Sequence, residues 1–300
     1  MIPFLPAPAF AYGRADSVSP LIRRVIANNP GPFTFTGTGT YIVGRGEAGA
    51  GVAVIDPGPL DEAHLAALLA AVAGQTVSHV LVTHTHRDHA PLARPFAEAV
   101  GAPVLAARLP ARPTHLSAAP DDDDDETFSS DVILTGGERL AGDGWTIEAL
   151  ATPGHASNHM AFVLCEENAL FSGDHVMGWS TTVVAPPDGD MAAYMASLDT
   201  VIARGFSTLW PTHGAPIVEP GPFLAAYRGH RLAREAQVLG RLVAGDRRIA
   251  DMVPALYAAV DSRLWPAASL SVWAHLIALE RAGQVRATSG PTIDAVWTLA

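Results

Sequence analysis

Three histidines and one aspartate fall within six residues in the first third of the chain. The segment THTHRDH, residues 83–89, contains His84, His86, Asp88 and His89 and directly follows an apolar run. Side chains two residues apart on an extended chain leave the same face, so His84 and His86 can bind one metal ion. Asp88 and His89 lie where the chain turns and can face a second metal ion. This segment therefore predicts a metal site in which one loop supplies four ligands.

Three later motifs contain residues of the same chemical types. They are TPGH ending at His155, SGD ending at Asp174, and PTHG containing His213. Each motif alone is ordinary, yet together they fall in the chain order and at the loop positions that a seven-ligand dinuclear site requires. Cys165 is the only cysteine, so a cysteine-based zinc cluster is excluded and the metal ligands must be histidines and carboxylates.

Short strands and helices must position these motifs. Apolar runs predict a hairpin from residues 40–43 and 52–55, and a strand at 79–82 that leads straight into THTHRDH. The same reasoning predicts strands at 103–107, 132–135, 145–150, 159–165, 169–171 and 208–210, and helices at 60–73, 91–100, 191–203 and 221–243. Each ligand motif then ends a strand or opens a loop, where protein scaffolds commonly present functional groups.

The last part of the chain differs in character from about residue 247. Helices are predicted at 249–260 and 267–283, followed by a β wing at 284–299, which together indicate a helical or winged-helix appendage. We therefore predict a catalytic domain at residues 1–243 and an appendage at 244–300. The appendage contains five arginines and five acids, so it lacks the basic stripe of a duplex-DNA reader. Covering the active site or supporting a homo-oligomer is the favoured role.

Composition limits the remaining classes. The chain has 300 residues, of which 49% are hydrophobic and 16% charged, as expected of a globular protein with a sizeable core. A net charge of −11 argues against a broad nucleic-acid surface, because phosphates require clustered basic residues. No window approaches the roughly 18 consecutive apolar residues of a membrane span. The first residues lack a basic group before Arg14 and are broken by three prolines, so we predict no export signal and a cytoplasmic protein.

The ligand motifs resemble those of one known family. HxHxDH, a distant His after TPG, an Asp in SGD and a His in a glycine-flanked turn are the ligand pattern of the metallo-β-lactamase superfamily. This resemblance implies an α+β fold, the αββα sandwich, with the metal ions at one edge between the sheets. It further implies that Asp174 bridges two metal ions. The other ligands would divide into His84, His86 and His155 for the first ion, and Asp88, His89 and His213 for the second.

Within the superfamily, the chain is most similar to the lactamase-beta-like protein 2 group, which is related to glyoxalase II. The likeness extends over residues 29–44, IDPG, THTHRDH, TPGH, residues 171–183, PTHG, the YRGHR helix and the C-terminal appendage. Members are described as metal-dependent hydrolases, and the animal ones as endoribonucleases that act on single-stranded RNA. Gly39 stands where Asn is expected in GTNTY, and His175 where the animal proteins carry Cys. These departures leave the substrate open.

A dinuclear centre predicts hydrolysis. Two divalent cations lower the pKa of a shared water from 15.7 to about 7, and the bridging hydroxide that forms is the nucleophile. Asp88 and Asp174 are the predicted catalytic residues, because Asp88 can orient the water and Asp174 bridges the ions. Histidine and carboxylate ligands favour Zn²⁺ but are also compatible with Fe or Mn. Two cations exceed the charge of two aspartates and a hydroxide, so the pocket suits an anionic substrate.

The substrate class has two principal alternatives. One is the phosphodiester bond of single-stranded RNA, and the other is a small molecule with a thioester, lactone or β-lactam bond, as in a glyoxalase II-like enzyme. An iron-dependent oxidoreductase is a third reading, which the His at position 86 and the absence of a flavodoxin domain disfavour. Tyr227, Arg231 and Arg234 share one helical face, because they are spaced i, i+4 and i+7. Two interpretations are open: this face contacts a phosphate or carboxylate of the substrate, or it is a solvated basic stripe.

Overall fold

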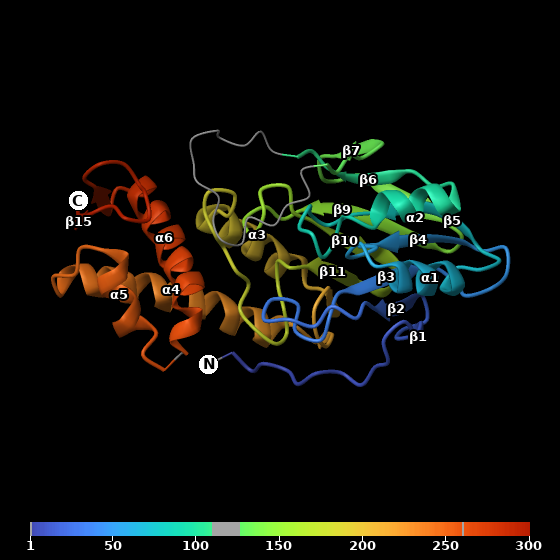
Figure 1. Cartoon of the computed structure of the whole chain (residues 1–300), viewed down its shortest axis with the longest axis horizontal. Coiled ribbons are helices and arrows are strands. Elements are labelled where there is room, and N and C mark those ends of the chain that lie inside the picture. Colours follow the sequence, from blue (N-terminus) through green and yellow to red (C-terminus); the bar gives the residue numbers. More distant parts are fainter. Residues whose placement is uncertain (1, 110–126, 260) are drawn as a thin grey trace.

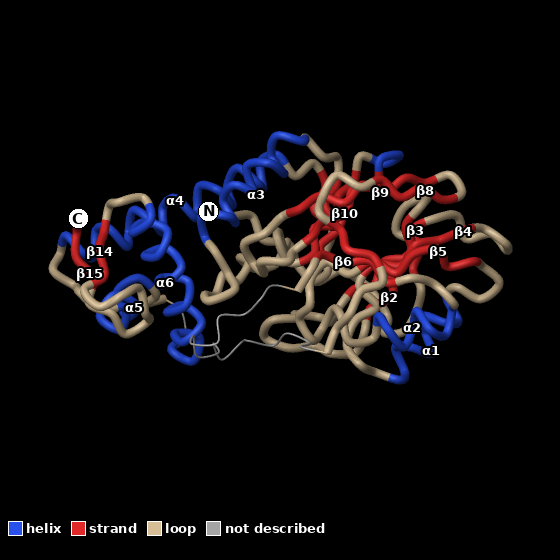
Figure 2. Tube along the Cα trace, turned by 90° about the horizontal axis from the view of Figure 1, so that it is seen from above, coloured by secondary structure: helices blue, strands red, loops and turns tan. Residues whose placement is uncertain are grey.

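Two β-sheets lie face to face with helices on their outer surfaces (Figure 1). The computed structural model describes residues 2–109, 127–259 and 261–300. Apolar residues from both sheets form a buried core between them, which includes Tyr41, Trp145 and Phe162. This arrangement is the αββα sandwich that the sequence predicts, followed by a winged-helix domain (Figure 2).

The first sheet has seven strands in sequence order. They are β1 (Asp16–Ser17), β2 (Ile22–Ile26), β3 (Gly39–Val43), β4 (Gly51–Ile55), β5 (Thr76–Leu81), β6 (Val104–Ala107) and β7 (Val132–Leu134). Strands β1 to β4 are antiparallel, and β4 to β7 run parallel to one another. The predicted hairpin of residues 40–43 and 52–55 is confirmed as β3 and β4. Strand β2, with Arg23 and Arg24 in its centre, lacks the apolar alternation of a strand and was not predicted.

The second sheet has six strands. They are β8 (Arg139–Gly142), β9 (Trp145–Ala151), β10 (Met160–Leu164), β11 (Ala169–Gly173), β12 (Thr208–Pro211) and β13 (Ile217–Val218), in the order β13-β12-β11-β10-β9-β8. Only the β11–β12 pair is parallel. The predicted strand at 159–165 ends at Leu164, because Cys165–Glu167 form a single 3-10 turn (η1).

Each outer face is covered by two helices. Helices α1 (Glu62–Ala71) and α2 (Ala93–Val100) pack on the first sheet around a second apolar cluster. Helices α3 (Met191–Arg204) and α4 (Gly221–Val243) cover the second sheet through a third cluster. Asp190 caps α3 by accepting a bond from Ala193 N at 2.9 Å, which satisfies one of the free amides at the helix start.

The C-terminal domain has its own apolar core. It contains α5 (Ile249–Leu256), the 3-10 turn η2 (Ser262–Leu264), α6 (Trp265–Arg281), and a small wing of β14 (Val285–Ala287) and β15 (Trp297–Leu299). Helix α5 is shorter than predicted and contains Pro254, whose ring is unfavourable inside a helix.

Helix α4 joins the two domains. Its Phe223 and Tyr227 belong to the core beneath the second sheet, whereas Val238 and Leu242 belong to the core of the C-terminal domain. One continuous helix therefore carries the C-terminal domain beside the sandwich (Figure 1). Among the helices that the structure describes, none is both long and apolar enough to cross a membrane.

Candidate metal centre

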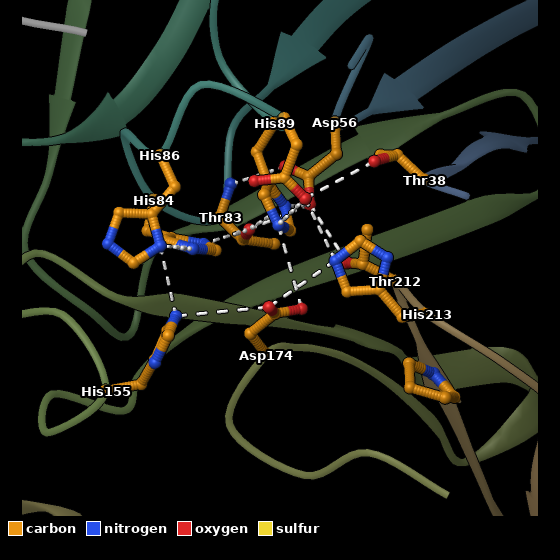
Figure 3. Close-up of polar contacts among 12 residues, drawn as sticks. Thr38, Asp56, Thr83, His84, His86, His89, His155, Asp174, Thr212 and His213 are labelled. Atoms are coloured by element: carbon orange, nitrogen blue, oxygen red, sulfur yellow. Dashed lines mark hydrogen bonds and ion pairs between the residues drawn. The ribbon is translucent and has the colours of Figure 1, made fainter. Parts of the chain in front are cut away.

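The predicted ligands meet at one edge of the sandwich because they follow the ends of neighbouring strands. The loop after β5 carries His84, His86, Asp88 and His89, and the loop after β9 carries His155. Asp174 directly follows β11, and His213 lies just beyond β12. Figure 3 shows His86 and His155 on one side of Asp174 and His213 on the other. The structure thus brings together all seven residues that the sequence singles out.

The first cluster consists of three histidines. The Nε2 atom of His84 lies 2.9 Å from Nδ1 of His86, and Nε2 of His155 lies 3.2 Å from that same Nδ1 atom. Three imidazole nitrogens at one point, with a carboxylate near them, form the kind of ligand set that a Zn²⁺ ion takes.

The second cluster combines a carboxylate with two histidines. Oδ2 of Asp88 lies 3.0 Å from Nε2 of His213 and 3.3 Å from Nε2 of His89. Asp174 lies between the clusters, since its carboxylate oxygens are 3.5 Å from His213, 3.7 Å from His89 and 3.9 Å from His155. A carboxylate in this position can bridge two ions.

Four histidines direct Nε2 into the site because Nδ1 is held from behind. His155 donates Nδ1–H to Val183 O at 2.6 Å, and His213 donates to Gly37 O at 3.2 Å. Nδ1 of His89 lies 2.9 Å from Asp56, and Nδ1 of His84 lies 3.0 Å from Oγ1 of Thr83. Such bonds fix the tautomer and ring orientation of metal-ligating histidines. His86 differs, because it presents Nδ1 to the cluster.

Asp56 is one of two functional residues that the sequence reasoning missed. Its fully buried carboxylate accepts bonds from Thr83 N at 2.7 Å, Thr83 Oγ1 at 2.8 Å and Thr212 Oγ1 at 3.2 Å, in addition to His89. Thr83 Oγ1 in turn faces His84, so one carboxylate orients a ligand in each cluster. The sequence signal that could have identified Asp56 is its position in IDPG, where an acid directly follows an apolar strand.

His159 is a second missed residue, because in the sequence it is one of several scattered histidines. Its Nδ1 lies 2.8 Å from Oγ1 of Thr152, and its Nε2 accepts from the backbone N of Asp174 at 3.1 Å. Gly173 has φ +52°, and a Cβ atom there would lie 2.5 Å from Nε2 of His159. Glycine in SGD therefore allows the backbone of Asp174 to approach this imidazole.

The charges of the two clusters differ in the metal-free chain. Burial lowers the pKa of His155 to about 4, with His86 adding to the effect, and burial and neighbouring imidazoles place the pKa of His84 well below its usual value. Burial would also lower the pKa of His213, but Asp174 and Asp88 outweigh it and raise that pKa to about 10. His84 and His155 of the first cluster are therefore neutral, whereas the second cluster is held together by ion pairs.

Two buried atoms of the site lack a hydrogen-bond partner. They are Nε2 of His89 and Oδ1 of Asp174. Buried polar atoms are rarely left unsatisfied, and both atoms face the space between the clusters. The donors around them are imidazole nitrogens and carboxylate oxygens, so they fit two divalent cations, as is typical of dinuclear sites in this ligand pattern.

A cavity of about 430 Å³ opens onto the site. His86, Asp88, His155, Asp174 and His213 line one part of it. The remaining wall comes from distant parts of the chain, namely residues 32–33, 177 and 179–183, Arg231 of α4, and residues 257, 264, 267, 268 and 271 of the C-terminal domain. Its size is that of a small-molecule site, and both domains form it.

The three residues predicted to contact substrate have different positions. Arg231 lines the cavity, as the prediction requires. Tyr227 lies outside the cavity lining and is fully buried behind it, where its hydroxyl accepts from Thr182 N at 2.5 Å. Arg234 also lies outside the lining, because its guanidinium stacks on the ring of Tyr257 at 4.1 Å and bonds Leu256 O. A shared helical face does not decide which residues reach the cavity, since the C-terminal domain packs over part of that face.

Family models match both parts of the chain. The metallo-beta-lactamase superfamily matches residues 35–213, and the beta-lactamase associated winged helix domain matches residues 249–297. Two solved structures share the fold at low identity. A metallo-beta-lactamase family protein from Thermus thermophilus is 21% identical, with a TM-score of 0.74 over 95% of this chain and 100% of that one. A beta-lactamase domain protein from Burkholderia ambifaria is 22% identical, with a TM-score of 0.79 over 98% and 95%.

Closer sequence relatives are fungal proteins. An atrochrysone carboxyl ACP thioesterase from Aspergillus chevalieri is 37% identical over 228 residues, which are 75% of this chain and 67% of that protein. A protein of the same name from Claviceps purpurea is 32% identical over 75% of this chain and 66% of its own length. A lactamase-like protein from Aspergillus niger is 32% identical over 76% and 65%. The matched region thus spans about two thirds of these relatives, and none of the three has a nuclease name.

Proposed function

The chain belongs to the metallo-β-lactamase superfamily of metal-dependent hydrolases, and we propose that its substrate is an acyl thioester. Two of the relatives above are named as thioesterases that act on a carrier-bound acyl group. The alternative drawn from the sequence is thereby favoured over RNA cleavage, for which no comparison gives support.

The observation that carries this proposal is the wall of the cavity. Opposite the metal ligands it is formed by apolar or uncharged side chains, such as Met177, Trp179, Tyr257 and Leu264. Among the residues that the structure describes, Arg231 is the only basic side chain in the lining apart from the histidine ligands. An RNA backbone requires clustered basic residues along its phosphates. An acyl chain requires apolar surface, which this wall supplies.

Two divalent metal ions, for which we favour Zn²⁺, would be held by the seven ligands and would polarise the thioester carbonyl and lower the pKa of a water molecule. The carboxylate of Asp88 is 26% exposed and lines the cavity, so it can accept a hydrogen bond from the attacking water and hold it beside the carbonyl carbon. Asp174 keeps the two clusters at a fixed separation, because it contacts residues of both. The apolar wall excludes water from the acyl chain.

The test combines metal analysis with a panel of substrates. Purified protein is analysed for metal content and assayed with decanoyl-CoA, benzoyl-CoA, nitrocefin and bis(p-nitrophenyl) phosphate, with thiol release followed by a colorimetric reagent. We expect about two zinc ions per chain, as in other two-metal sites, and turnover of the thioesters. His213→Ala should lower zinc content and turnover together, whereas His79→Ala, outside the site, should leave both unchanged. Phosphodiester turnover without thioester turnover would overturn the proposal.

A further inference from the structure

Arg231 is a buried cation in the wall of the catalytic cavity. Its side chain is only 4% exposed, and in the part of the chain that the structure describes it forms no ion pair. Among the residues that the structure describes, the acids of the cavity lining are Asp88 and Asp174, and both pair with histidines of the metal clusters. A guanidinium is always charged in proteins, so its burial without a carboxylate is costly unless a ligand supplies the opposite charge.

The contacts of Arg231 orient the guanidinium without neutralising it. Nη2 donates to Thr182 O at 2.5 Å, and the guanidinium carbon lies over the rings of Tyr194 at 4.9 Å and Tyr227 at 5.8 Å. Nε is buried and has no hydrogen-bond partner. Aromatic faces attract a cation but carry no net charge. Arg231 therefore keeps donors and a full positive charge beside the cavity.

The nearby groups Arg234, His230 and His275 provide no negative charge for Arg231. Arg234 lies one turn further along α4, and His230 precedes Arg231. His275 of α6 is also near, because Arg231, Arg234 and His230 add to the burial that lowers its pKa to about 3, which leaves this imidazole neutral. Both ring nitrogens of His275 are buried and have no partner. Among the residues that the structure describes, Nε of Arg231 and both ring nitrogens of His275 are therefore buried donors or acceptors without a hydrogen-bond partner.

The position of Arg231 within the cavity limits which part of a substrate can reach it. Pro32, Phe33 and Leu264 are the more exposed residues of the lining and mark its opening. Arg231 is buried, as are Thr182, which accepts its hydrogen bond, and Ala268 of the C-terminal domain in the same lining. If the thiol part of the substrate is attached to a carrier, that part must pass through the opening, and the acyl part must occupy the interior.

We propose that Arg231 binds an anionic oxygen group on the acyl part of the substrate. The preferred substrates are then acyl thioesters that carry a carboxylate, or an ionised phenol or enol, away from the reacting carbonyl. This inference rests on the proposed thioesterase function and names its substrate class. A phosphate on the thiol part of the substrate has the same kind of anionic oxygens. In a carrier-bound substrate, however, that phosphate would lie toward the opening of the cavity and away from Arg231.

The test compares substrates that differ only in the anionic group. Glutaryl and pentanoyl thioesters of N-acetylcysteamine have acyl chains of equal length and no phosphate. Hydrogen bonds to charged groups contribute about 1.5–3 kcal/mol, so kcat/KM should favour the glutaryl thioester by about 10- to 100-fold. Arg231→Gln should abolish this preference, and Arg231→Lys should retain part of it. Arg228→Gln is the matched control, because Arg228 lies on the same helix but pairs with Asp199 on the surface.

Several outcomes separate the possibilities. A wild-type preference for pentanoyl over glutaryl would overturn the proposal, and this readout stands even if Arg231→Gln fails to fold. The pentanoyl thioesters of pantetheine and of phosphopantetheine test whether Arg231 instead binds a phosphate on the thiol part of the substrate. If Arg231→Gln slows only the phosphorylated form, the acyl-side assignment is wrong. If no thioester is hydrolysed, the proposed function fails, yet calorimetry of glutarate and pentanoate binding to the zinc-loaded protein still tests Arg231. Equal affinities for the two acids would then overturn its role.

Discussion

Replacing Asp56 by asparagine should weaken metal binding at both clusters. Asn has nearly the same shape, and it tolerates the left-handed backbone of this position, φ +49°. The amide nitrogen, however, is a donor where a carboxylate oxygen accepted. Oδ1 of Asp56 accepts from Thr83 N, and Oδ2 accepts from Thr83 Oγ1, His89 and Thr212. Whichever way the amide turns, at least one of these buried donors loses its acceptor.

The contacts set the expected magnitude. A buried donor without an acceptor costs about 1–3 kcal/mol, so the free energy of unfolding of the metal-free protein should fall by that amount. Because His89, and through Thr83 also His84, would lose orientation, zinc affinity should fall by about 10- to 100-fold. That loss corresponds to about 1.4–2.7 kcal/mol of binding free energy.

The assay is competition for zinc with a fluorescent chelator, combined with thermal unfolding of metal-free and zinc-loaded protein. Thr212→Val removes only the longest of the four bonds, at 3.2 Å, and should cost less than Asp56→Asn. Asp199→Asn replaces an exposed carboxylate on α3 and should leave zinc affinity unchanged. Wild-type zinc affinity in Asp56→Asn would refute the reasoning that one carboxylate orients ligands in both clusters.

Three further predictions follow from the same geometry. Gly173→Ala should lower zinc content, because the added Cβ would lie 2.5 Å from Nε2 of His159. Gly205→Ala is the control, because Gly205 has a similar φ but no atom near the added Cβ, and its zinc content should not change. Metal analysis of the two variants tests this prediction. Zinc affinity of the second cluster should rise with pH between about 6 and 9, because the pKa of His213 is raised to about 10 and the metal ion must displace its proton. His155 of the first cluster, with its pKa lowered to about 4, should contribute little pH dependence in this range. Calorimetry of zinc binding in buffers of different ionisation enthalpy measures the number of protons released on binding. Ser271→Phe should narrow the cavity and reduce kcat/KM for decanoyl-CoA more than for acetyl-CoA, and equal effects on both would contradict the assignment of this wall to the acyl chain.

Much of the site could be predicted from the sequence because metal ligands cluster in short motifs. One loop carries four of the seven residues, and the others end strands that the apolar pattern locates. The sandwich and the wing could be predicted for the same reason, since alternating apolar residues and family motifs are local signals. The strand ends then bring the motifs to one edge, where the three candidate ligand groups lie.

The residues behind the ligands could not be assigned in this way. Asp56 and His159 act through hydrogen bonds to residues 27 and 15 positions away along the chain. The local sequence, an acid in IDPG and one of several scattered histidines, does not identify those partners. Their roles depend on the register of the strands that carry them.

The tertiary structure alone decided which residues of α4 face the cavity. Tyr227, Arg231 and Arg234 share a helical face, and the periodicity of the sequence establishes that much. The sandwich packs against Tyr227, the C-terminal domain supplies Tyr257 as a partner for Arg234, and only Arg231 remains at the cavity. The amino-acid sequence by itself determined the ligand types, their order and the fold class, because each is encoded over a few residues. The substrate wall arises where two domains meet, so only long-range packing could define it.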